Sequence, residues 1–177
     1  MSLSREKNSK KVLTNRTEYA IIIIERGKEI DTMKINFDMD GTIANLYGVE
    51  GWLEMLIAED TTPYAMAKPL LNMSLLARYL NKLTAEGYEI CVISWLSKNG
   101  SEEYNKAVTE VKKAWLSKHL ASVEFAEIHI VPYGTPKHTL GNGILFDDEI
   151  GNRNAWNGVA HDEKNIIEVL KNLLTNC

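Results

Sequence analysis

The sequence contains little cysteine and no long apolar run. Only 2 of its 177 residues are cysteines. Cys91 lies in an apolar stretch and Cys177 ends the chain, so we expect no disulfide framework and a cytoplasmic setting, where thiols stay reduced. The longest purely apolar run, residues 20–24, is far shorter than the roughly 20 residues of a membrane-spanning helix. The basic start of the chain lacks the apolar core of a secretory signal, so we expect neither a signal nor a membrane partner.

Charge is unevenly distributed along the chain. The sequence carries 20 Lys and Arg against 24 Asp and Glu, a net charge of −4. Residues 1–17 hold five basic side chains and one acidic side chain, which gives this arm +4 and leaves −8 for the rest. An acidic body does not suit the phosphate backbone of nucleic acid, so we expect no nucleic-acid partner. The basic arm alone suits such contacts, but we interpret it as a solvated tail.

From residue 34 onward, short apolar runs alternate with amphipathic stretches that have the helical period of 3.6 residues. The runs predict strands at 35–38, 89–94, 127–131, 144–147 and 158–160. The amphipathic stretches predict helices at 73–86, 102–120 and 163–175. Such alternation is typical of β-α-β units, so it predicts a three-layer, Rossmann-like α/β fold with a parallel sheet. Residues 18–25 predict one possible extra strand within the N-terminal segment 1–33.

Polar residues close three of the predicted strands, namely Asp38, Ser94 and Asp147. Ligands of parallel sheets bind beyond the carboxyl ends of the strands, so these are the candidate site residues. Asp38 and Asp40 are two positions apart, and their side chains therefore point the same way where the strand ends. Two close carboxylates repel each other, which favours a bound cation. Oxygen ligands suit Mg²⁺, and no His or Cys residues have the spacing of a zinc site.

Two lysines are candidates for binding an anion. Pro136 suits the first position of a helix, which places Lys137 at a helix N-terminus, where anions bind readily. Lys98, four residues after Ser94, is the alternative lysine. The hydroxyl group of Ser94 is suited to donate a hydrogen bond to a phosphate oxygen. A lysine and a serine beside several carboxylates indicate a site for a phosphate together with a divalent cation.

The order of four segments resembles the motifs of the haloacid dehalogenase (HAD)-like hydrolase superfamily. The segments are FDMDGT at 37–42, VIS at 92–94, the lysine that follows Thr135-Pro136, and LFDDE at 145–149. The resemblance implies a magnesium-dependent phosphatase in which Asp38 attacks phosphorus and forms an aspartyl-phosphate. It also implies that Asp40 protonates the leaving oxygen and then deprotonates the attacking water.

The same resemblance implies which residues bind phosphate and metal. The residues expected to hold the transferred phosphoryl group are Thr42, Ser94 and Lys137. The residues expected to hold Mg²⁺ are Asp38, Asp40 through its carbonyl, Asp147 and Asp148. Either of the last two can be the closer ligand.

A small helical cap is implied between the first two motifs. By the resemblance, residues 34–44 and 73–177 form the core domain, and residues 45–72 form an inserted cap that selects the substrate. Tyr47 and Trp52 are candidates for stacking on a nucleobase, and Lys68 is a candidate for contacting a phosphate. The alternative is that Trp52 and the aliphatic residues after it only form the cap's own core.

This pattern is similar to the 5′(3′)-deoxyribonucleotidases and to small HAD-like proteins of phages and bacteria that have no assigned substrate. It predicts a Mg²⁺-dependent phosphomonoester hydrolase for a small phosphorylated substrate, with (deoxy)nucleotides as candidates. One alternative is a non-catalytic binding module, against which the retained Asp40 argues. Another is phosphotransfer or end-processing on nucleic acid, for which only the basic arm argues. The sequence does not fix the oligomeric state.

Overall fold

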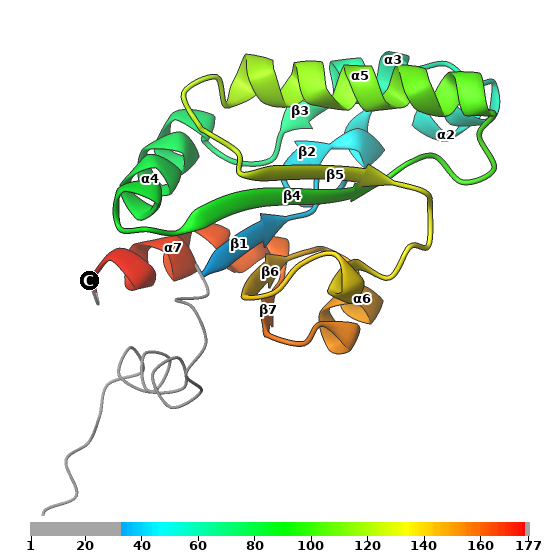
Figure 1. The fold of residues 1–177 in the computed structure, drawn as a ribbon. Coiled ribbons are helices and arrows are strands. Elements are labelled where there is room, and N and C mark those ends of the chain that lie inside the picture. The colour runs from blue at the N-terminus through cyan, green and yellow to red at the C-terminus, as the bar shows by residue number, and fades with distance from the viewer. Residues whose placement is uncertain (1–32, 176–177) are drawn as a thin grey trace, which may run out of the picture. The chain divides into compact units, whose positions relative to one another are not determined.

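The computed structural model describes residues 33–175, which fold around one parallel sheet (Figure 1). Its five strands are hydrogen-bonded in the order β5-β4-β1-β6-β7, and every neighbouring pair is parallel. The strands are β1 (Lys34–Phe37), β4 (Glu89–Trp95), β5 (Glu127–Val131), β6 (Ile144–Phe146) and β7 (Val159–His161). The five runs predicted as strands from residue 34 onward are therefore strands of one sheet. The extra strand predicted at 18–25, with all of the segment 1–33 except Met33, lies outside the described residues.

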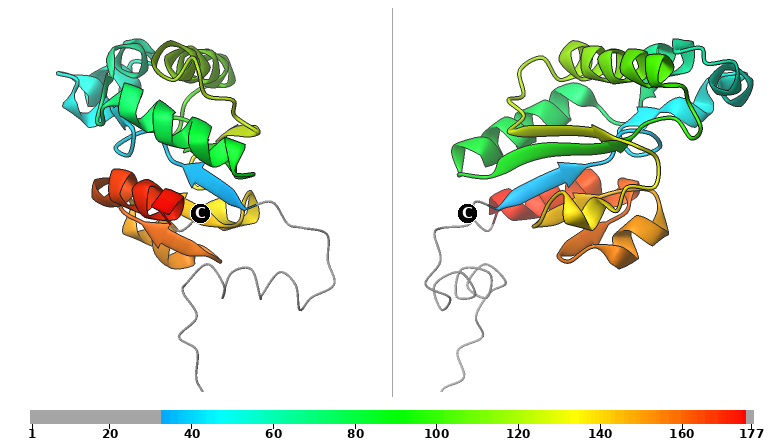
Figure 2. Two further views of the ribbon diagram at one scale, coloured as in Figure 1. Left: turned by 90° about the vertical axis from the view of Figure 1, so that its left-hand side faces the viewer. Right: turned by 45° about the vertical axis from the view of Figure 1, so that its right-hand side comes forward.

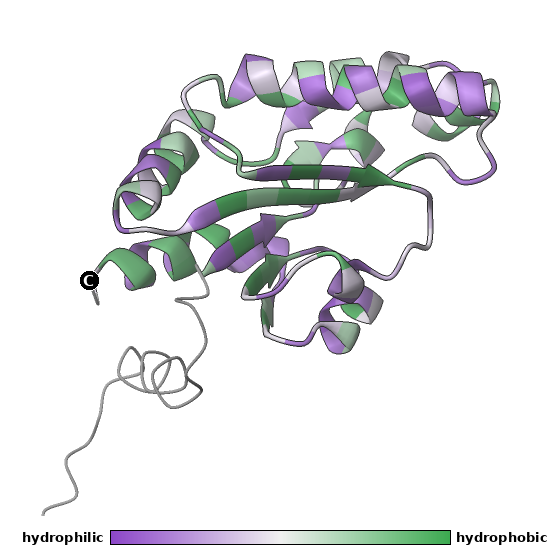
Figure 3. Ribbon diagram, viewed as in Figure 1, coloured by the Kyte–Doolittle hydropathy of each residue, from purple (hydrophilic) through white to green (hydrophobic). Residues whose placement is uncertain are grey.

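The two faces of the sheet have separate apolar clusters. Ile35 and Phe37 of β1 face a large buried cluster that contains side chains from three helices. On the opposite face, Ile93 and Leu145 pack against Trp156. Figure 2 shows the sheet between its helices, and Figure 3 shows that the central strands are rich in apolar residues while the helices alternate with polar ones. The helices of the first cluster are α4 (Met73–Ala85), α5 (Glu102–His119) and α7 (Ile166–Thr175), and α6 (Ile150–Ala155) ends beside Trp156.

Side-chain caps set where the main helices begin. Asn72 precedes α4 and Ser101 precedes α5, and in both cases the side-chain oxygen accepts a hydrogen bond from the N–H of the third helical residue. The helix predicted at 163–175 begins later than expected. Asp162 accepts a hydrogen bond from the N–H two residues later, but it starts a 3-10 turn, η3 (Glu163–Asn165), and α7 follows that turn. No helix among residues 33–175 is long and apolar enough to span a membrane.

A small helical insert separates β1 from α4. A two-stranded antiparallel pair, β2 with β3, closes its base, and its apolar side chains Leu46 and Tyr64 are buried against Tyr104 and Val108 of α5. The elements of the insert are β2 (Ala44–Asn45), η1 (Leu46–Gly48), α2 (Trp52–Ile57), α3 (Thr62–Met66) and β3 (Lys68–Pro69). The inserted cap of the predicted fold class is thus present, while its assignment to residues 45–72 stays a prediction.

The helix predicted to begin at Pro136 does not form. Pro136 instead precedes a single 3-10 turn, η2 (Lys137–Thr139). Too few residues lie between this turn and β6 for a helix, because Gly143, with φ of 81°, already turns the chain into the strand. Anion binding by the backbone of a helix N-terminus is therefore ruled out at this position, and only the side chain of Lys137 remains.

Candidate active site

Asp38 and Asp40 lie at the carboxyl end of β1, where a tight turn begins. The N–H of Asp38 donates to the carbonyl of Phe146, 2.9 Å away, which extends the pairing of β1 with β6 to the site. Gly41 makes the turn at φ of 85°. The positive φ favours glycine, and a Cβ at this position would lie 2.3 Å from Oδ2 of Asp148, so a larger residue would displace that carboxylate. The turn therefore brings the first motif against the last one.

Lys137 joins two carboxylates from distant parts of the chain. Its ammonium group donates to Oδ1 of Asp38 at 2.7 Å and to Oδ2 of Asp147 at 2.6 Å, and the residue is only 3% exposed. Burial by itself lowers the pKa of Lys137, but the negative charges of Asp38 and Asp147 outweigh burial, and the net effect is a raised pKa. Lys137 is therefore charged and neutralises part of a strongly acidic site.

Asp147 and Asp148 follow β6 and are held by their neighbours in sequence. Asp147 is fully buried, and its carboxylate accepts hydrogen bonds from the side chain of Asn152 at 3.1 Å. The guanidinium of Arg153 donates to the carbonyls of both aspartates at 2.7 Å. Burial, with a contribution from the charge of Asp38, raises the pKa of Asp147, and the same causes raise the pKa of Asp148 to about 7. At both carboxylates, burial and repulsion by neighbouring acids outweigh the nearby positive charge.

Thr42, which the sequence predicts to contact phosphate, lies between two carboxylates. The residue is fully buried, and its hydroxyl lies 3.1 Å from Oδ2 of Asp38 and 3.3 Å from Oδ1 of Asp148. The same oxygen accepts the N–H of Asp148 at 3.0 Å. Thr42 therefore holds two carboxylates in position and is not among the residues that line the cavity described below. Ser94 is also fully buried and outside that lining.

Lys112 is a further residue of this site, and no sequence motif includes it. It extends from α5, is 1% exposed, and donates to Oδ2 of Asp40, to Oγ of Ser94 at 2.8 Å and to the carbonyl of Trp95 at 2.6 Å. Burial raises the pKa of Asp40, Lys112 lowers it, and the charge of Asp38 adds to the rise, so that the net pKa is raised. The sequence signal for this role was the position of a lysine on the apolar face of the predicted helix 102–120, because a buried lysine needs partners for its charge.

The oxygen donors at this edge suit a magnesium ion. Among residues 33–175, no three His, Cys, Asp or Glu side chains already form a metal cage. Mg²⁺ usually takes only one or two carboxylates and completes its coordination with water and substrate phosphate. Asp38 and Asp148 meet that need, because both bond to the hydroxyl of Thr42 and their carboxylates are therefore close together. The donor set fits the predicted ion.

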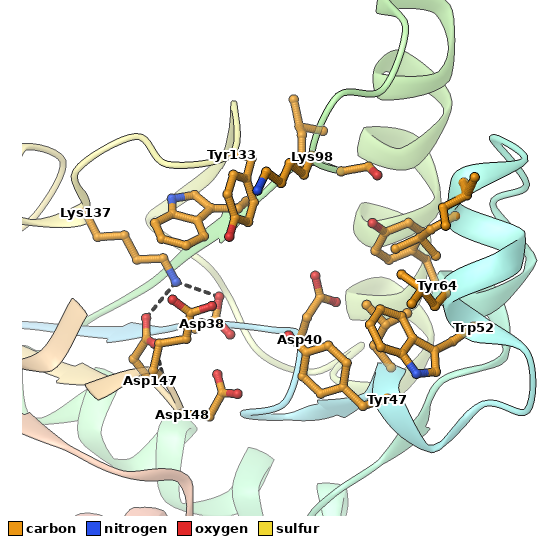
Figure 4. A pocket seen from close by; sticks show the side chains of 18 residues that line it. Asp38, Asp40, Tyr47, Trp52, Tyr64, Lys98, Tyr133, Lys137, Asp147 and Asp148 are labelled. Atoms are coloured by element: carbon orange, nitrogen blue, oxygen red, sulfur yellow. Dashed lines mark hydrogen bonds and ion pairs between the residues drawn. The ribbon is translucent and has the colours of Figure 1, made fainter. Parts of the chain in front are cut away.

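A cavity of about 310 Å³ opens above these carboxylates (Figure 4). Its floor contains Asp38, Asp40 and Lys137, whereas its walls are mainly aromatic and aliphatic. The rings of Trp95 and Tyr133 lie 5.0 Å apart on one side. The aromatic lining residues are Tyr47, Trp52, Tyr64, Trp95 and Tyr133. One end of a ligand therefore meets charge, and the rest meets an apolar wall.

The cap residues predicted to contact substrate separate into two groups. Tyr47 and Trp52 both line the cavity, and their rings form an edge-to-face pair with centroids 5.0 Å apart. Lys68 is exposed and is not among the lining residues, because β3 pairs it with Asn45 at the base of the cap. Lys98 lines the cavity instead, with its ammonium 5.5 Å from the centre of the Tyr133 ring.

Comparison with known proteins supports the fold. No protein-family model matches the sequence, and no curated protein does. The D,D-heptose 1,7-bisphosphate phosphatase of B. bronchiseptica, whose crystal structure contains magnesium and phosphate, matches 82% of this chain and 99% of its own, with a TM-score of 0.53 and 11% identity. The enzyme of the same name from Burkholderia thailandensis matches 81% and 99%, with a TM-score of 0.50 and 12% identity. At this identity the similarity shows the fold alone, and the predicted Rossmann-like α/β fold class with a parallel sheet is confirmed.

Proposed function

We propose that the protein is a magnesium-dependent phosphomonoester hydrolase that works through an aspartyl-phosphate on Asp38. One observation carries the proposal: Asp38 and Asp40 share a cavity with Lys137, Asp147 and Asp148, at the carboxyl end of a parallel sheet. Two phosphatases with this fold add weight, one of them crystallised with magnesium and phosphate. Bound Mg²⁺, held by Asp38, the Asp40 carbonyl and the Asp147–Asp148 pair, supplies charge neutralisation for the phosphate.

The proposed reaction has two steps, each of which is a displacement at phosphorus. A carboxylate oxygen of Asp38 forms a bond to phosphorus while the bond to the leaving oxygen breaks, and Asp40 gives its proton to that oxygen. In the second step Asp40 takes a proton from water, whose oxygen attacks phosphorus and displaces Asp38. Burial and the nearby charge of Asp38 raise the pKa of Asp40, which favours the protonated form that the first step needs. Lys137 keeps one oxygen of Asp38 paired throughout, which limits charge repulsion with the phosphate.

We propose a different role for one of the three predicted phosphate contacts and keep the other two. We propose that Thr42 orients Asp38 and Asp148 instead of contacting phosphate, because its hydroxyl already bonds to both carboxylates. The hydroxyl of Ser94 accepts a hydrogen bond from Lys112, so its own hydrogen remains for another acceptor. A phosphate oxygen is the acceptor that we propose for it. Lys137 keeps its proposed role beside the transferred group.

We further propose nucleotides as the substrate class, in line with the resemblance to deoxyribonucleotidases. The support is the wall of the cavity, in which Tyr47, Trp52 and Tyr133 present rings suited to a flat base. No residue of helix α2 is buried, and Trp52 with the aliphatic residues after it lines the cavity. This arrangement favours a substrate-facing role for Trp52 over a closed core within the cap. Sugar phosphates are the competing substrate class, because Ser97, Lys98 and Glu149 also line the cavity.

A phosphate-release screen tests both the proposed hydrolase activity and the proposed nucleotide substrate class. Wild-type protein and Asp38→Asn would be assayed with p-nitrophenyl phosphate, nucleoside monophosphates and sugar phosphates, with magnesium or with EDTA. We expect release that requires magnesium and Asp38, and that is fastest with nucleotides. A folded wild-type protein that binds magnesium but releases phosphate from none of these esters would contradict the hydrolase and favour the binding-module alternative. Faster release from sugar phosphates would contradict only the substrate class.

A further inference from the structure

Lys112 occupies a position on α5 where an apolar side chain is expected. The buried side of this helix runs through Tyr104, Val108, Lys112 and Leu116, each four residues after the last. A buried ammonium is costly unless all of its N–H groups have partners. Lys112 has three such acceptors, Asp40, Ser94 and the carbonyl of Trp95, and they account for all three N–H groups.

The partners of Lys112 all belong to the candidate site and come from different elements. Asp40 follows β1, while Ser94 and Trp95 end β4. The ammonium also lies 5.0 Å from the centre of the Tyr64 ring, which belongs to the cap. The lysine itself is fixed in the middle of an 18-residue helix. Lys112 therefore connects the end of β1, the end of β4 and the cap through one atom.

Charge balance alone does not account for this arrangement. Replacing a buried ion pair by apolar residues is often neutral or stabilising, so a pair of this kind is weak evidence for a stabilising role. The side chain of Asp40 is 16% exposed and lines the cavity, so solvent and ligand can reach it. The bond from Lys112 goes to Oδ2 alone, which fixes the rotation of the carboxylate and leaves Oδ1 without a bond to this lysine.

We propose that Lys112 is a positioning residue, which holds the Asp40 carboxylate and the Ser94 hydroxyl in the orientation that the reaction uses. The inference rests on the proposed phosphatase function. Oδ1 of Asp40 is the oxygen left for proton transfer to and from the substrate. Because Oγ of Ser94 accepts from Lys112, the hydroxyl hydrogen is directed to a different acceptor. The ammonium group of Lys112 thus fixes the orientation of the proton carrier, Asp40, and of Ser94, which donates a hydrogen bond to the phosphate.

The test compares Lys112→Met with Lys113→Met, which changes the adjacent, half-exposed lysine of the same helix. For nucleoside monophosphates we expect Lys112→Met to lower kcat by about tenfold or more while KM changes little, because general acid catalysis contributes 10²–10⁴-fold. For p-nitrophenyl phosphate the loss should be smaller, since its leaving group needs little protonation. Lys113→Met should behave as wild type.

A double-mutant cycle separates positioning from a general loss of structure. If Lys112 acts through Asp40, Lys112→Met should add little further loss to that of Asp40→Asn. Additive losses in the cycle, or wild-type activity in Lys112→Met, would each overturn the inference. Lys112→Leu, which also lacks an N–H donor, replaces Lys112→Met in every comparison if the methionine variant does not fold.

A readout that needs no turnover keeps this inference separate from the proposed function. Crystal structures of the wild type and the Lys112 variant show directly whether Asp40 and Ser94 turn to other rotamers. Unchanged rotamers would overturn the positioning role even in an active enzyme. An inactive wild type would contradict the phosphatase, whereas the rotamer comparison would still decide whether Lys112 sets the orientation of its partners.

Discussion

The ammonium group of Lys137 lies 2.7 Å from Oδ1 of Asp38, a residue 99 positions earlier in the chain. The same group also pairs with Asp147 at 2.6 Å. Lys137→Met would leave two buried carboxylates without their cation, and removing one partner of a buried pair typically costs about 3–5 kcal/mol. We therefore expect a loss of unfolding free energy of this order in EDTA, measured by denaturant melts, together with loss of turnover.

Magnesium should restore part of that stability, because it supplies positive charge to the same carboxylates. Lys98→Met is the matched control, since Lys98 lines the cavity, is exposed and has no ion pair among the described residues. A Lys137→Met protein as stable as the control would show that the ammonium does not neutralise this site.

Thr42→Val tests whether Thr42 orients carboxylates or contacts phosphate. Valine keeps the shape but leaves the N–H of Asp148 without its acceptor, which costs about 1–3 kcal/mol. Because Asp38 and Asp148 also lose a shared donor, we expect weaker magnesium binding, measured by calorimetry, and little change in the KM for substrate at saturating magnesium. Thr139→Val, which removes an exposed hydroxyl, should change neither. A rise in KM alone would favour the phosphate contact that the sequence predicted.

The stability of the metal-free protein should fall as pH rises. Asp148 has a folded-state pKa of about 7 against an ordinary value of 3.8, so between these values the folded state binds more protons than the unfolded state. Stability is then lost progressively as pH rises through this window. Magnesium binds the ionised carboxylate, so the stabilisation it gives should grow over the same range. Thermal melts with EDTA or magnesium measure both trends, and Asp148→Asn should flatten them.

The gain in unfolding free energy on magnesium binding has an expected size at saturation. At 100 times the dissociation constant, a ligand that binds only the folded state adds about 2.7 kcal/mol. A magnesium effect of the same size at pH 5 and at pH 8 would show that Asp148 does not titrate with metal binding.

Local sequence patterns predicted the sheet and the polar residues at the carboxyl ends of its strands. The five strands were visible because buried parallel strands are short, continuous apolar runs, and Asp38, Ser94 and Asp147 stood where those runs stop. Lysine positions were harder to interpret. Lys137 was expected to act at a helix N-terminus, but only one 3-10 turn forms there, and its side chain makes the contacts.

Contacts between distant segments were not predictable in the same way. Lys112 reaches Asp40 only because α5 packs across the ends of β1 and β4, and helical periodicity records that a position is buried but not what it faces. Thr42 was predicted to contact phosphate because it belongs to the first motif. Its hydroxyl also bonds to Asp148, which comes from a distant part of the chain, and this contact could not be predicted. Lys68 was chosen by its charge, and the pairing of β2 with β3 leaves it outside the cavity.

Trp52→Ala distinguishes a substrate contact from a packing role within the cap. Stacking of a base on an aromatic ring is worth about 1–3 kcal/mol by alanine substitution, so KM for a nucleoside monophosphate should rise about tenfold or more. Acetyl phosphate, which has no ring, should be hydrolysed at nearly the wild-type rate, because it reaches Asp38 without contacting the cap. Met66→Ala is the control, since Met66 is an exposed cap residue outside the cavity lining, and it should affect neither substrate. Equal loss with both substrates would mean that Trp52 supports the shape of the cap. No loss with either substrate would mean that the ring of Trp52 does not support a preference for nucleotides.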